Sequence, residues 1–407
     1  MTVTSTLTRV VVPAQRSRRA QRRQREDGLV VQVNRPGPAE FEVAGLYDLG
    51  TDSVPQRLAL LEYLVGLGAT IDDLVAARPG ELPLVASRIA LWGDRERLNF
   101  DEVAAAANIA PELVAHAWRA AGFPEPDPDP DVLTFSRHDV EILAGLEAGI
   151  ELLGEPVTIQ MIRVLGAAAA RVADASVSAF VVNIGPQAVE HEPAGLELAQ
   201  ANAESVVLVD SMSRAFDSFL RHHIDRAFRP HEAMEAVAGI DLVRRSIGFA
   251  DLVNSTAWTQ QLDLPALSQA LSLFDSTASE IVVGRGGRVV KLIGDEVMFV
   301  AHDPAIGIDI ALTLVDAFAS HDVLPPVRTG VATGDVLARD GDYSGPVVNL
   351  AARAVSVARP STLLVDTETL SALEGSTDFS SRPAGAFTLK GFAQRVKLSR
   401  VTRSASR

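Results

Sequence analysis

The sequence has no cysteine among its 407 residues. This absence excludes disulfide bonds, thiol catalysis and cysteine-ligated metal sites, and it is typical of proteins of the reducing cytoplasm. Basic residues are the minority charge, since 37 Lys and Arg stand against 52 Asp and Glu and give a net charge of -15. A chain this acidic argues against a chain-wide surface for nucleic acid or anionic lipid, although a local basic patch is compatible with it.

Long apolar runs are also absent. The most apolar segment, LGAAAARVADASVSAFVVNI, is interrupted by Arg171 and Asp174, whereas a membrane-spanning helix needs about 18 or more consecutive apolar residues. The N-terminus lacks the apolar core of a secretory signal. We therefore expect no membrane span and a cytoplasmic protein.

Two halves of different character follow an unusual start. Residues 28–205 have helical spacing and predict an all-α domain, residues 206–242 predict a helical linker, and residues 243–402 alternate β-branched and helical runs. The fold class expected is therefore α+β. Residues 1–27 contain RSRRAQRRQR and are expected to form a disordered basic tail, with a basic arm that contacts nucleic acid or lipid as the alternative.

Capping residues predict several helix boundaries in the first half. Thr70 and Ser136 each precede an acidic first turn, and Asn108 separates two short helices of which the second begins at Pro111. This last pair, LNFDEVAAAANIAPELVAHAWRAAGF, has helix-turn-helix spacing. Its second helix has Arg119 as its one firm cation, whereas a helix that reads a DNA groove normally carries more positive charge. We expect a scaffold and no nucleic-acid partner, and a DNA-binding regulator is the competing class.

Two aspartates in the second half predict a metal site. Asp251 ends the apolar strand of GFADLVNST, and Asp295 lies in the Gly-Asp turn of a hairpin within RVVKLIGDEVMFV. If their strands are neighbours, both carboxylates reach one edge of the sheet. Two hard oxygen ligands without a full protein cage suit Mg²⁺ that is bound together with substrate phosphates. Glu296 is expected to be only an exposed neighbour.

Four further side chains have the chemistry to bind a nucleotide. Lys291 lies four residues before Asp295, an even spacing that favours one face of a strand. The segment GDYSGPVVNLAAR supplies Asp342, Asn349 and Arg353, and the last two share a helix face because they are four residues apart. An amide and a guanidinium directed at one point stabilise developing negative charge, and the fixed fork of arginine suits a phosphoryl oxygen.

These segments together resemble the catalytic domain of the class III nucleotidyl cyclases. FADLVNST, KLIGDEVMF and GDYSGPVVNLAAR are similar to its three signature blocks in the same order, and FTLKGF is similar to a fourth, weaker block. The resemblance covers residues 243–402 and implies a ferredoxin-like catalytic domain. LVNST lacks the Gly-Phe often found in that loop, which leaves the packing of the loop open but not the ligands.

The resemblance implies an adenylate cyclase that forms cyclic AMP and pyrophosphate from ATP. It implies two Mg²⁺ or Mn²⁺ ions held by Asp251 and Asp295, with one ion activating the ribose 3′-hydroxyl and the other holding the triphosphate. The remaining roles that it implies are adenine recognition by Lys291 and Asp342, ribose orientation by Asn349, transition-state stabilisation by Arg353 and terminal-phosphate contact by Lys390.

Substrate choice and assembly also follow from the resemblance. Guanylyl members typically carry Glu and a small polar residue where this chain has Lys291 and Asp342, so ATP is favoured over GTP. The family's site lies at a dimer interface, with metal ligands from one subunit and purine and transition-state residues from the other. A complete set in one chain therefore implies a homodimer with two equivalent sites. A nucleotide sensor with a non-catalytic cyclase domain is the alternative.

The first half is expected to regulate the second, with a purely structural role in holding two catalytic domains together as the alternative. The layout resembles that of soluble, autoinhibited, pH-responsive adenylyl cyclases of mycobacteria. His222 and His223 lie in the expected linker, and His223 shares an apolar stripe with Phe216 and Phe219. Because histidine titrates near neutrality, acidification is expected to release the catalytic domains to close on each other. A solvated histidine without such a role is equally compatible, and a fatty acid in an apolar helical pocket is a second candidate effector.

Overall fold

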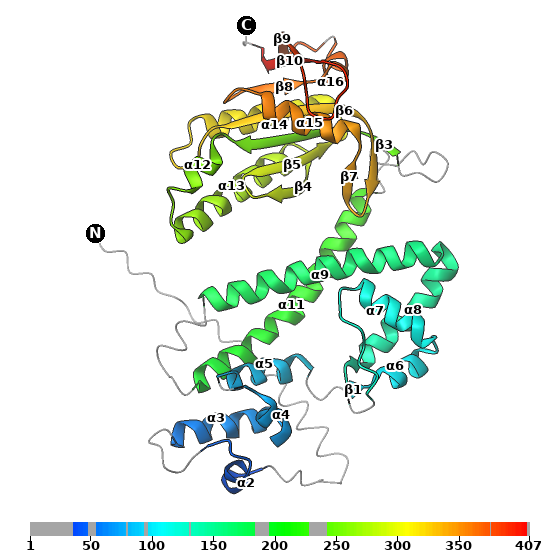
Figure 1. Cartoon of the computed structure of the whole chain (residues 1–407), viewed down its shortest axis with the longest axis vertical. Coiled ribbons are helices and arrows are strands. Elements are labelled where there is room, and N and C mark those ends of the chain that lie inside the picture. The colour runs from blue at the N-terminus through cyan, green and yellow to red at the C-terminus, as the bar shows by residue number, and fades with distance from the viewer. Residues whose placement is uncertain are drawn as a thin grey trace, which may run out of the picture. The chain divides into compact units, whose positions relative to one another are not determined.

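The computed structural model describes residues 36–47, 54–78, 80–92, 97–129, 132–183, 195–227, 242–374 and 376–404. The chain divides into two compact units, one built mainly from the N-terminal half and the other from the C-terminal domain (Figure 1). The basic tail expected at residues 1–27 lies outside the described residues, and the domain boundaries expected from the sequence stay predictions.

Helices make up the N-terminal half, apart from one short strand pair. The pair joins β1 (Arg97–Leu98) and β2 (Phe135–Ser136) in antiparallel register and is the only departure from the expected all-α character within the described residues. The helices are α2 (Pro38–Val43), α3 (Val54–Leu67), α4 (Ile71–Ala76), α5 (Leu82–Trp92), α6 (Phe100–Ala107), α7 (Pro111–Ala120), α8 (Arg137–Leu153), α9 (Glu155–Asn183) and α11 (Leu196–Ala227).

The predicted helix starts are confirmed by their caps. The Thr70 hydroxyl accepts the amide of Asp73 at 3.1 Å, and the Asp73 carboxylate accepts the amide of Thr70 at 3.0 Å, which closes a capping box at the start of α4. Ser136 forms the same box at α8. Asn108 adopts φ 57° between α6 and α7, the left-handed conformation that Asn tolerates better than most residues.

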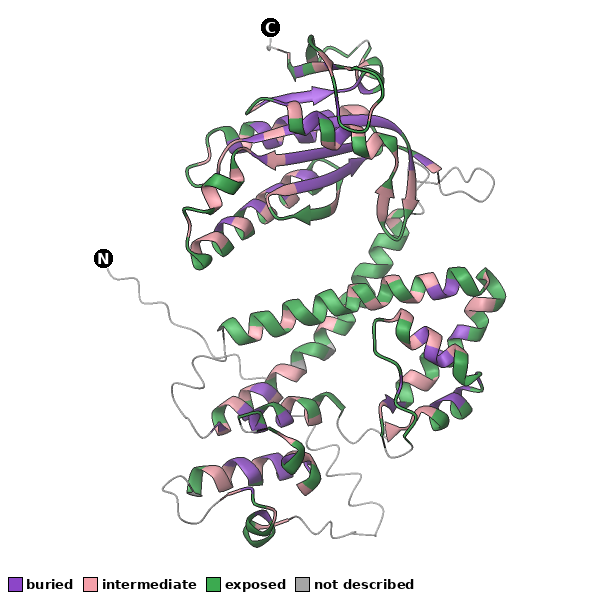
Figure 2. Cartoon of the chain, in the orientation of Figure 1, coloured by how far each residue is buried: buried purple, intermediate pink, exposed green. Residues whose placement is uncertain are grey.

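Most residues of the two longest helices of this half, α9 and α11, are exposed (Figure 2), and many of these residues are apolar. α9 meets the length and composition of a membrane-spanning helix over Glu155–Val182, with a mean hydropathy of 1.4 and none of the window buried. Arg171 and Asp174 interrupt that window, and the absence of a membrane span stays a prediction. On α11, Phe216 and Phe219 are 39% and 63% exposed, so neither is packed into a core within the described residues.

The C-terminal domain contains one large sheet and helices on both of its faces. Its elements are β3 (Leu242–Leu252), α12 (Ser255–Thr259), α13 (Leu264–Gly284), β4 (Arg288–Ile293), β5 (Glu296–Ala301), α14 (Pro304–Ala319), β6 (Val327–Arg339), β7 (Asp342–Ser344), α15 (Pro346–Val357), β8 (Leu363–Val365), α16 (Thr367–Ser371), β9 (Phe379–Phe387) and β10 (Val396–Arg403).

The strand order explains why the expected ferredoxin-like fold forms. The succession β3, α13, β4, β5, α14, β6 folds into the strand order β4-β5-β3-β6 with antiparallel neighbours, which is the ferredoxin-like βαββαβ arrangement. β8 extends this sheet in parallel with β6, and β10 and β9 follow. The fold class predicted from the sequence, α+β with a helical first half, is confirmed.

Alternating residues of the strands build two separate cores, one on each face of the sheet. Ala250 and Leu252 of β3 pack with Phe274 of α13 and Phe318 of α14. On the opposite face, Ile247 and Phe249 of β3 pack with Ala351 and Val355 of α15, together with Tyr343 of β7. The face covered by α15 is called the α15 face below.

One predicted strand is not a strand over its whole length. FTLKGF is one of the β-runs of residues 243–402 and so predicts an extended segment, but β9 ends at Phe387 and the following residues form the loop to β10. One hydrogen bond and one glycine explain the turn. The amide of Phe392 donates to the carbonyl of Leu389 at 3.1 Å, and Gly391 has φ +92°, which is compatible with glycine and interrupts an extended strand.

Candidate active site

A row of charged side chains crosses the sheet at the end of β3. Asp251 pairs in register with Glu296 of β5 on one side and with Arg328 of β6 on the other. Directly opposed residues of antiparallel strands point to the same face, and alternation along β3 places Asp251 on the same side as Phe249, the α15 face. The row therefore lies at one edge of the face that α15 partly covers.

Arg328 holds the carboxylate of Asp251 through two nitrogens. Its Nε and Nη2 lie 2.8 Å and 2.6 Å from Oδ2 of Asp251, whose side chain is 17% exposed. Burial raises the pKa of Asp251 above its ordinary value, Arg328 opposes that rise, and the neighbouring carboxylate of Asp295 adds to it. The two aspartates predicted as metal ligands thus interact with each other within one chain.

The turn between β4 and β5 presents Asp295. Gly294 adopts φ +64°, and the carbonyl of Asp295 accepts the amide of Leu252 at 3.1 Å, which ties the turn to the end of β3. β3 and β5 are neighbours, as the sequence required for both carboxylates to reach one edge of the sheet.

The expectation for Glu296 is wrong. Glu296 is half-buried rather than exposed, because it occupies the first position of β5 directly opposite Asp251. Burial, followed by the charges of Asp251 and Asp295, raises the pKa of Glu296 to about 7. A third acidic side chain therefore belongs to this cluster.

The donor set fits a divalent cation that is shared with a substrate. In the described part of the chain, no group of three or more His, Asp and Glu side chains has the arrangement of a metal cage, and this includes the cluster of Asp251, Asp295 and Glu296. Two interacting carboxylates in a half-buried site repel each other, and a hard cation relieves that repulsion. Because the protein offers few ligands, phosphate oxygens would complete the coordination of Mg²⁺.

Lys291 and Asp342 form a second polar group. Lys291 Nζ lies 2.5 Å from Asp342 Oδ2, and Oδ1 of Asp342 accepts the amide of Tyr343 at 2.8 Å. Burial alone would raise the pKa of Asp342, but its hydrogen bonds with Lys291 and Tyr343 outweigh burial and lower the pKa. Lys291 pairs with Met298, which pairs with Phe249, so this group also lies on the α15 face.

The other predicted site residues lie apart from these two groups. Asn349 and Arg353 are exposed on α15, four residues apart as expected, and Lys390 is exposed in the loop between β9 and β10. The described contacts join none of the three to either group. The predicted regulatory residues, His222 and His223, are exposed on α11.

Sequence reasoning missed Arg328. In the sequence it is one cation in the β-run PVRTGVATG, and only the register of β3 with β6 places it beside Asp251. An arginine within this otherwise uncharged run was the available signal. In the helix-turn-helix segment, by contrast, the one firm cation, Arg119 of α7, is paired with Glu125 at 2.7 Å, and the expectation of no nucleic-acid partner stays a prediction.

Models of known protein families match both halves of the chain. A family model described as adenylate cyclase regulatory domain matches residues 39–209, and one described as adenylate and guanylate cyclase catalytic domain matches residues 242–401. An adenylate cyclase of Streptomyces coelicolor is 33% identical over 72% of this chain and 76% of its own length. The chain belongs to the class III adenylate cyclases.

Two mycobacterial relatives extend the similarity of this class III adenylate cyclase over both domains. An uncharacterized protein of Mycobacterium tuberculosis is 35% identical over 83% of this chain and 88% of its own length. A protein of the same species named as a pH-sensitive adenylate cyclase is 30% identical over 89% of this chain and 92% of its own length. The similarity to both proteins therefore spans the regulatory and the catalytic half of this cyclase.

Proposed function

We propose that the chain converts ATP to 3′,5′-cyclic AMP and pyrophosphate at a site shared by two copies of its catalytic domain. The observation that carries the proposal is the pair of interacting carboxylates, Asp251 and Asp295, on the same sheet face as the Lys291–Asp342 pair. Relatives named adenylate cyclase support the same activity.

In the proposed reaction, a bond forms between the ribose 3′-oxygen and the α-phosphorus while the bond from that phosphorus to the bridging oxygen of pyrophosphate breaks. Asp251 and Asp295 would hold two Mg²⁺ or Mn²⁺ ions, which when bound make the 3′-hydroxyl more acidic and neutralise the triphosphate. Asn349 orients the ribose, Arg353 stabilises the charge that develops at the α-phosphate, and Lys390 binds the terminal phosphates. Positioning and electrostatics supply most of the rate.

Base selection follows from hydrogen-bond polarity at Lys291 and Asp342. Lys291 donates to a ring nitrogen of adenine, and Asp342 accepts from its amino group. Guanine has a carbonyl where adenine has the amino group, so it would place an acceptor against a carboxylate. A mismatch of this kind costs about 1–3 kcal/mol per buried group, and the chain is proposed to prefer ATP to GTP.

A homodimer completes the proposed site. The resemblance assigns the metal ligands to one subunit and the base and transition-state residues to the other. Asn349, Arg353 and Lys390 are exposed and join neither polar group within one chain, which supports that division. A two-fold axis would then produce two equivalent sites.

The helical half is proposed to inhibit the catalytic domain until a proton or a lipid acts on it. Support comes from the regulatory-domain match, from the similarity to the cyclase named as pH-sensitive and from the exposure of His222 and His223. Replacement of both histidines by glutamine should flatten the pH profile of the full-length enzyme. An unchanged profile would remove these two residues from the mechanism.

The deciding experiment measures cyclic AMP from ATP, with Mg²⁺ and with Mn²⁺, between pH 5 and 8. Full-length protein is compared with residues 241–407. We expect activity from both, with pH dependence in the full-length protein alone. Absence of product from both proteins with either metal would favour a nucleotide sensor with a non-catalytic domain.

A further inference from the structure

A β-bulge in β4 brings two cations to one face of the sheet. Arg288 pairs with Val300 and Lys291 pairs with Met298, with a register shift between Val289 and Lys291. In a regular strand, residues three apart point to opposite faces. The bulge adds one residue, Val290, and so both Arg288 and Lys291 lie opposite side chains of the α15 face.

The hairpin of β6 and β7 carries Asp342 to this face and has little backbone support of its own. Within the described sheet, β7 pairs only with β6, over three residue pairs. The turn between the strands contains Asp340 at φ 56° and Gly341 at φ 79°, both in the left-handed region. Backbone pairing therefore fixes Asp342 relative to β6, whereas its position relative to Lys291 on β4 depends on side chains.

Arg288 supplies two of the side-chain contacts between β4 and this hairpin. Its guanidinium carbon lies 5.4 Å from the centroid of the Tyr343 ring, within the range of a cation–π contact. Its Nη1 donates to the carbonyl of Gly341 at 3.4 Å. These contacts flank Asp342 on both sides along the chain, and Val290 packs in the same apolar cluster as Tyr343.

The Lys291–Asp342 pair does not hold the hairpin in place by itself. The two side chains are 41% and 44% exposed. Ion pairs this exposed contribute little, because solvent screens them and two long side chains lose freedom. A planar guanidinium that stacks on a ring and also donates to a backbone carbonyl is a better anchor, because its geometry is fixed.

We propose that Arg288 is a positioning residue that anchors the β6–β7 hairpin to β4 and thereby sets Asp342 beside Lys291 for the selection of adenine. The inference rests on the proposed function, since it assigns a cause to the base preference of that site. In this role Arg288 acts through the hairpin and not on the reacting atoms. Its loss should therefore weaken ATP binding and base discrimination more than turnover at saturating ATP.

The test compares Arg288→Met and Arg288→Lys in the full-length protein. Methionine keeps the aliphatic stem and removes the charge, whereas lysine keeps the charge and loses the planar fork. We expect Arg288→Met to raise the KM for ATP about tenfold and to lower the ATP-to-GTP ratio of kcat/KM by a similar factor, which is the effect of one misplaced hydrogen bond. Arg288→Lys should fall between Arg288→Met and the wild type.

Variants of the ring and a distant arginine provide matched controls. Tyr343→Phe keeps the aromatic face and should behave as wild type, while Tyr343→Ala should resemble Arg288→Met. The double variant Arg288→Met, Tyr343→Ala should show a smaller loss than the sum of the two single variants, because both remove the contact between Arg288 and the Tyr343 ring. Arg382→Ala removes an exposed arginine from β9 and should change neither KM nor the ratio.

A second readout separates this inference from the proposed function. Binding of non-hydrolysable ATP and GTP analogues to the metal-free protein reports base preference without turnover. If the wild type makes no cyclic AMP, the proposed function fails, and the analogue preference still tests Arg288. Retention of the full adenine preference by Arg288→Met, or loss of kcat with KM and the ratio unchanged, would overturn the role assigned to Arg288. Thermal melting of each variant identifies any that fails to fold, and if Arg288→Met is among them, the KM and the base preference of Arg288→Lys decide the question.

Discussion

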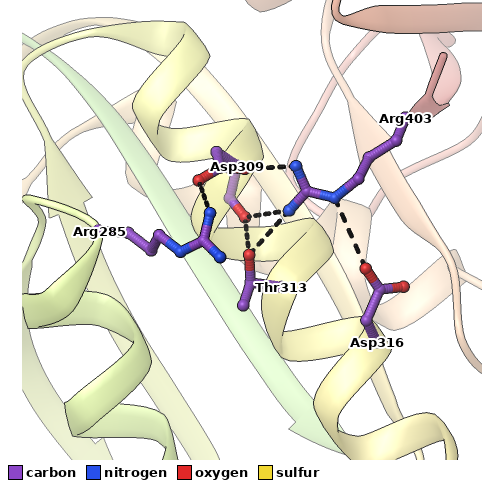
Figure 3. A network of polar contacts seen from close by, with 5 residues as sticks. All are labelled: Arg285, Asp309, Thr313, Asp316 and Arg403. Atoms are coloured by element: carbon purple, nitrogen blue, oxygen red, sulfur yellow. Dashed lines mark hydrogen bonds and ion pairs between the residues drawn. The ribbon is translucent and has the colours of Figure 1, made fainter. Parts of the chain in front are cut away.

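At the scale of single residues, Asp309 of α14 joins three elements of the catalytic domain (Figure 3). Its carboxylate accepts Arg285, the C-cap of α13, at 2.6 Å and Arg403 of β10 at 2.5 Å. Arg403 also donates to Thr313 at 2.8 Å. Burial alone would raise the pKa of Asp309, but the hydrogen bonds from Arg403 and Arg285 outweigh burial and lower it.

Replacement of Asp309 by asparagine should lower the free energy of unfolding by about 1–3 kcal/mol at pH 7, because both arginines lose the opposite charge and one of them faces an amide NH2 in place of an acceptor oxygen. The lowered pKa fixes the sign of the pH dependence. The carboxylate stabilises the fold above its unfolded pKa of about 3.9, and this contribution disappears as the pH falls through the folded pKa. In urea unfolding, the difference in the free energy of unfolding between wild type and Asp309→Asn should therefore be constant from pH 7 to 5. It should become smaller below about pH 4.

Asp316 offers the matched control for this measurement. Its carboxylate is 67% exposed and lies 3.6 Å from Arg403, so Asp316→Asn should change stability by less than about 0.5 kcal/mol. If the difference in the free energy of unfolding between wild type and Asp309→Asn stays constant down to pH 3, the Asp309 carboxylate is not what stabilises the contacts among α13, α14 and β10.

Single residues also show what the sequence can and cannot predict. Asp251 and Asp295 follow from their places at strand and turn ends, which hydrophobic patterning reveals. Arg328 and Glu296 join them only through strand register, and register depends on long-range pairing that no local pattern specifies. Two of the four residues of this cluster can therefore be predicted from the sequence, and the other two cannot.

At the scale of elements, the approach of α15 to β6 depends on Gly330. A Cβ at this position would lie 2.7 Å from the carbonyl oxygen of Ala351 and 2.8 Å from the amide nitrogen of Val355. Both atoms belong to the backbone of α15, so neither can move away by a change of side-chain rotamer. Any side chain at position 330 must therefore move α15, the helix that carries Asn349 and Arg353.

We expect Gly330→Ala to lower the free energy of unfolding by about 1–3 kcal/mol and to reduce kcat of the folded fraction, because overpacking shifts the helix. Gly284→Ala is the control. A Cβ there meets no atom within 4 Å, and alanine favours a helix over glycine by up to about 1 kcal/mol. Urea unfolding and cyclic AMP formation measure the two effects. If Gly330→Ala is destabilised but its kcat is unchanged, the substitution does not shift α15 in the folded protein, and the prediction is wrong.

Elements differ in how far the sequence predicts them. Helices α4 and α8 begin where Thr70 and Ser136 predict, because a cap is a local hydrogen bond. The bulge at Val290 and the early end of β9 were not predicted, since each depends on contacts with another strand or within a loop.

At the scale of the whole molecule, the proposed dimer predicts complementation between inactive variants. Asp251→Asn should abolish the metal ligand set of one subunit, and Asn349→Ala should abolish the ribose contact of the other. When the two variants are co-expressed, half of the dimers are mixed, and each mixed dimer has one intact site. Activity should therefore return to about a quarter of the wild-type value.

One control and one contradicting result bear on this prediction. The double variant Asp251→Asn, Asn349→Ala co-expressed with wild type provides the control, because its mixed dimers have no intact site. Absence of recovery from the single variants, with dimers present by light scattering, would mean that each site is built within one chain.

The ion pair between Arg328 and Asp251 bears on whether the domain needs a bound metal ion in order to fold. The half-buried carboxylate already has a counter-charge that was made with the chain, so this domain does not need an ion as a folding template in the way a zinc finger does. Protein made without the proposed divalent ions would therefore stay folded, and no refolding would have to precede the proposed reaction once the ions are added.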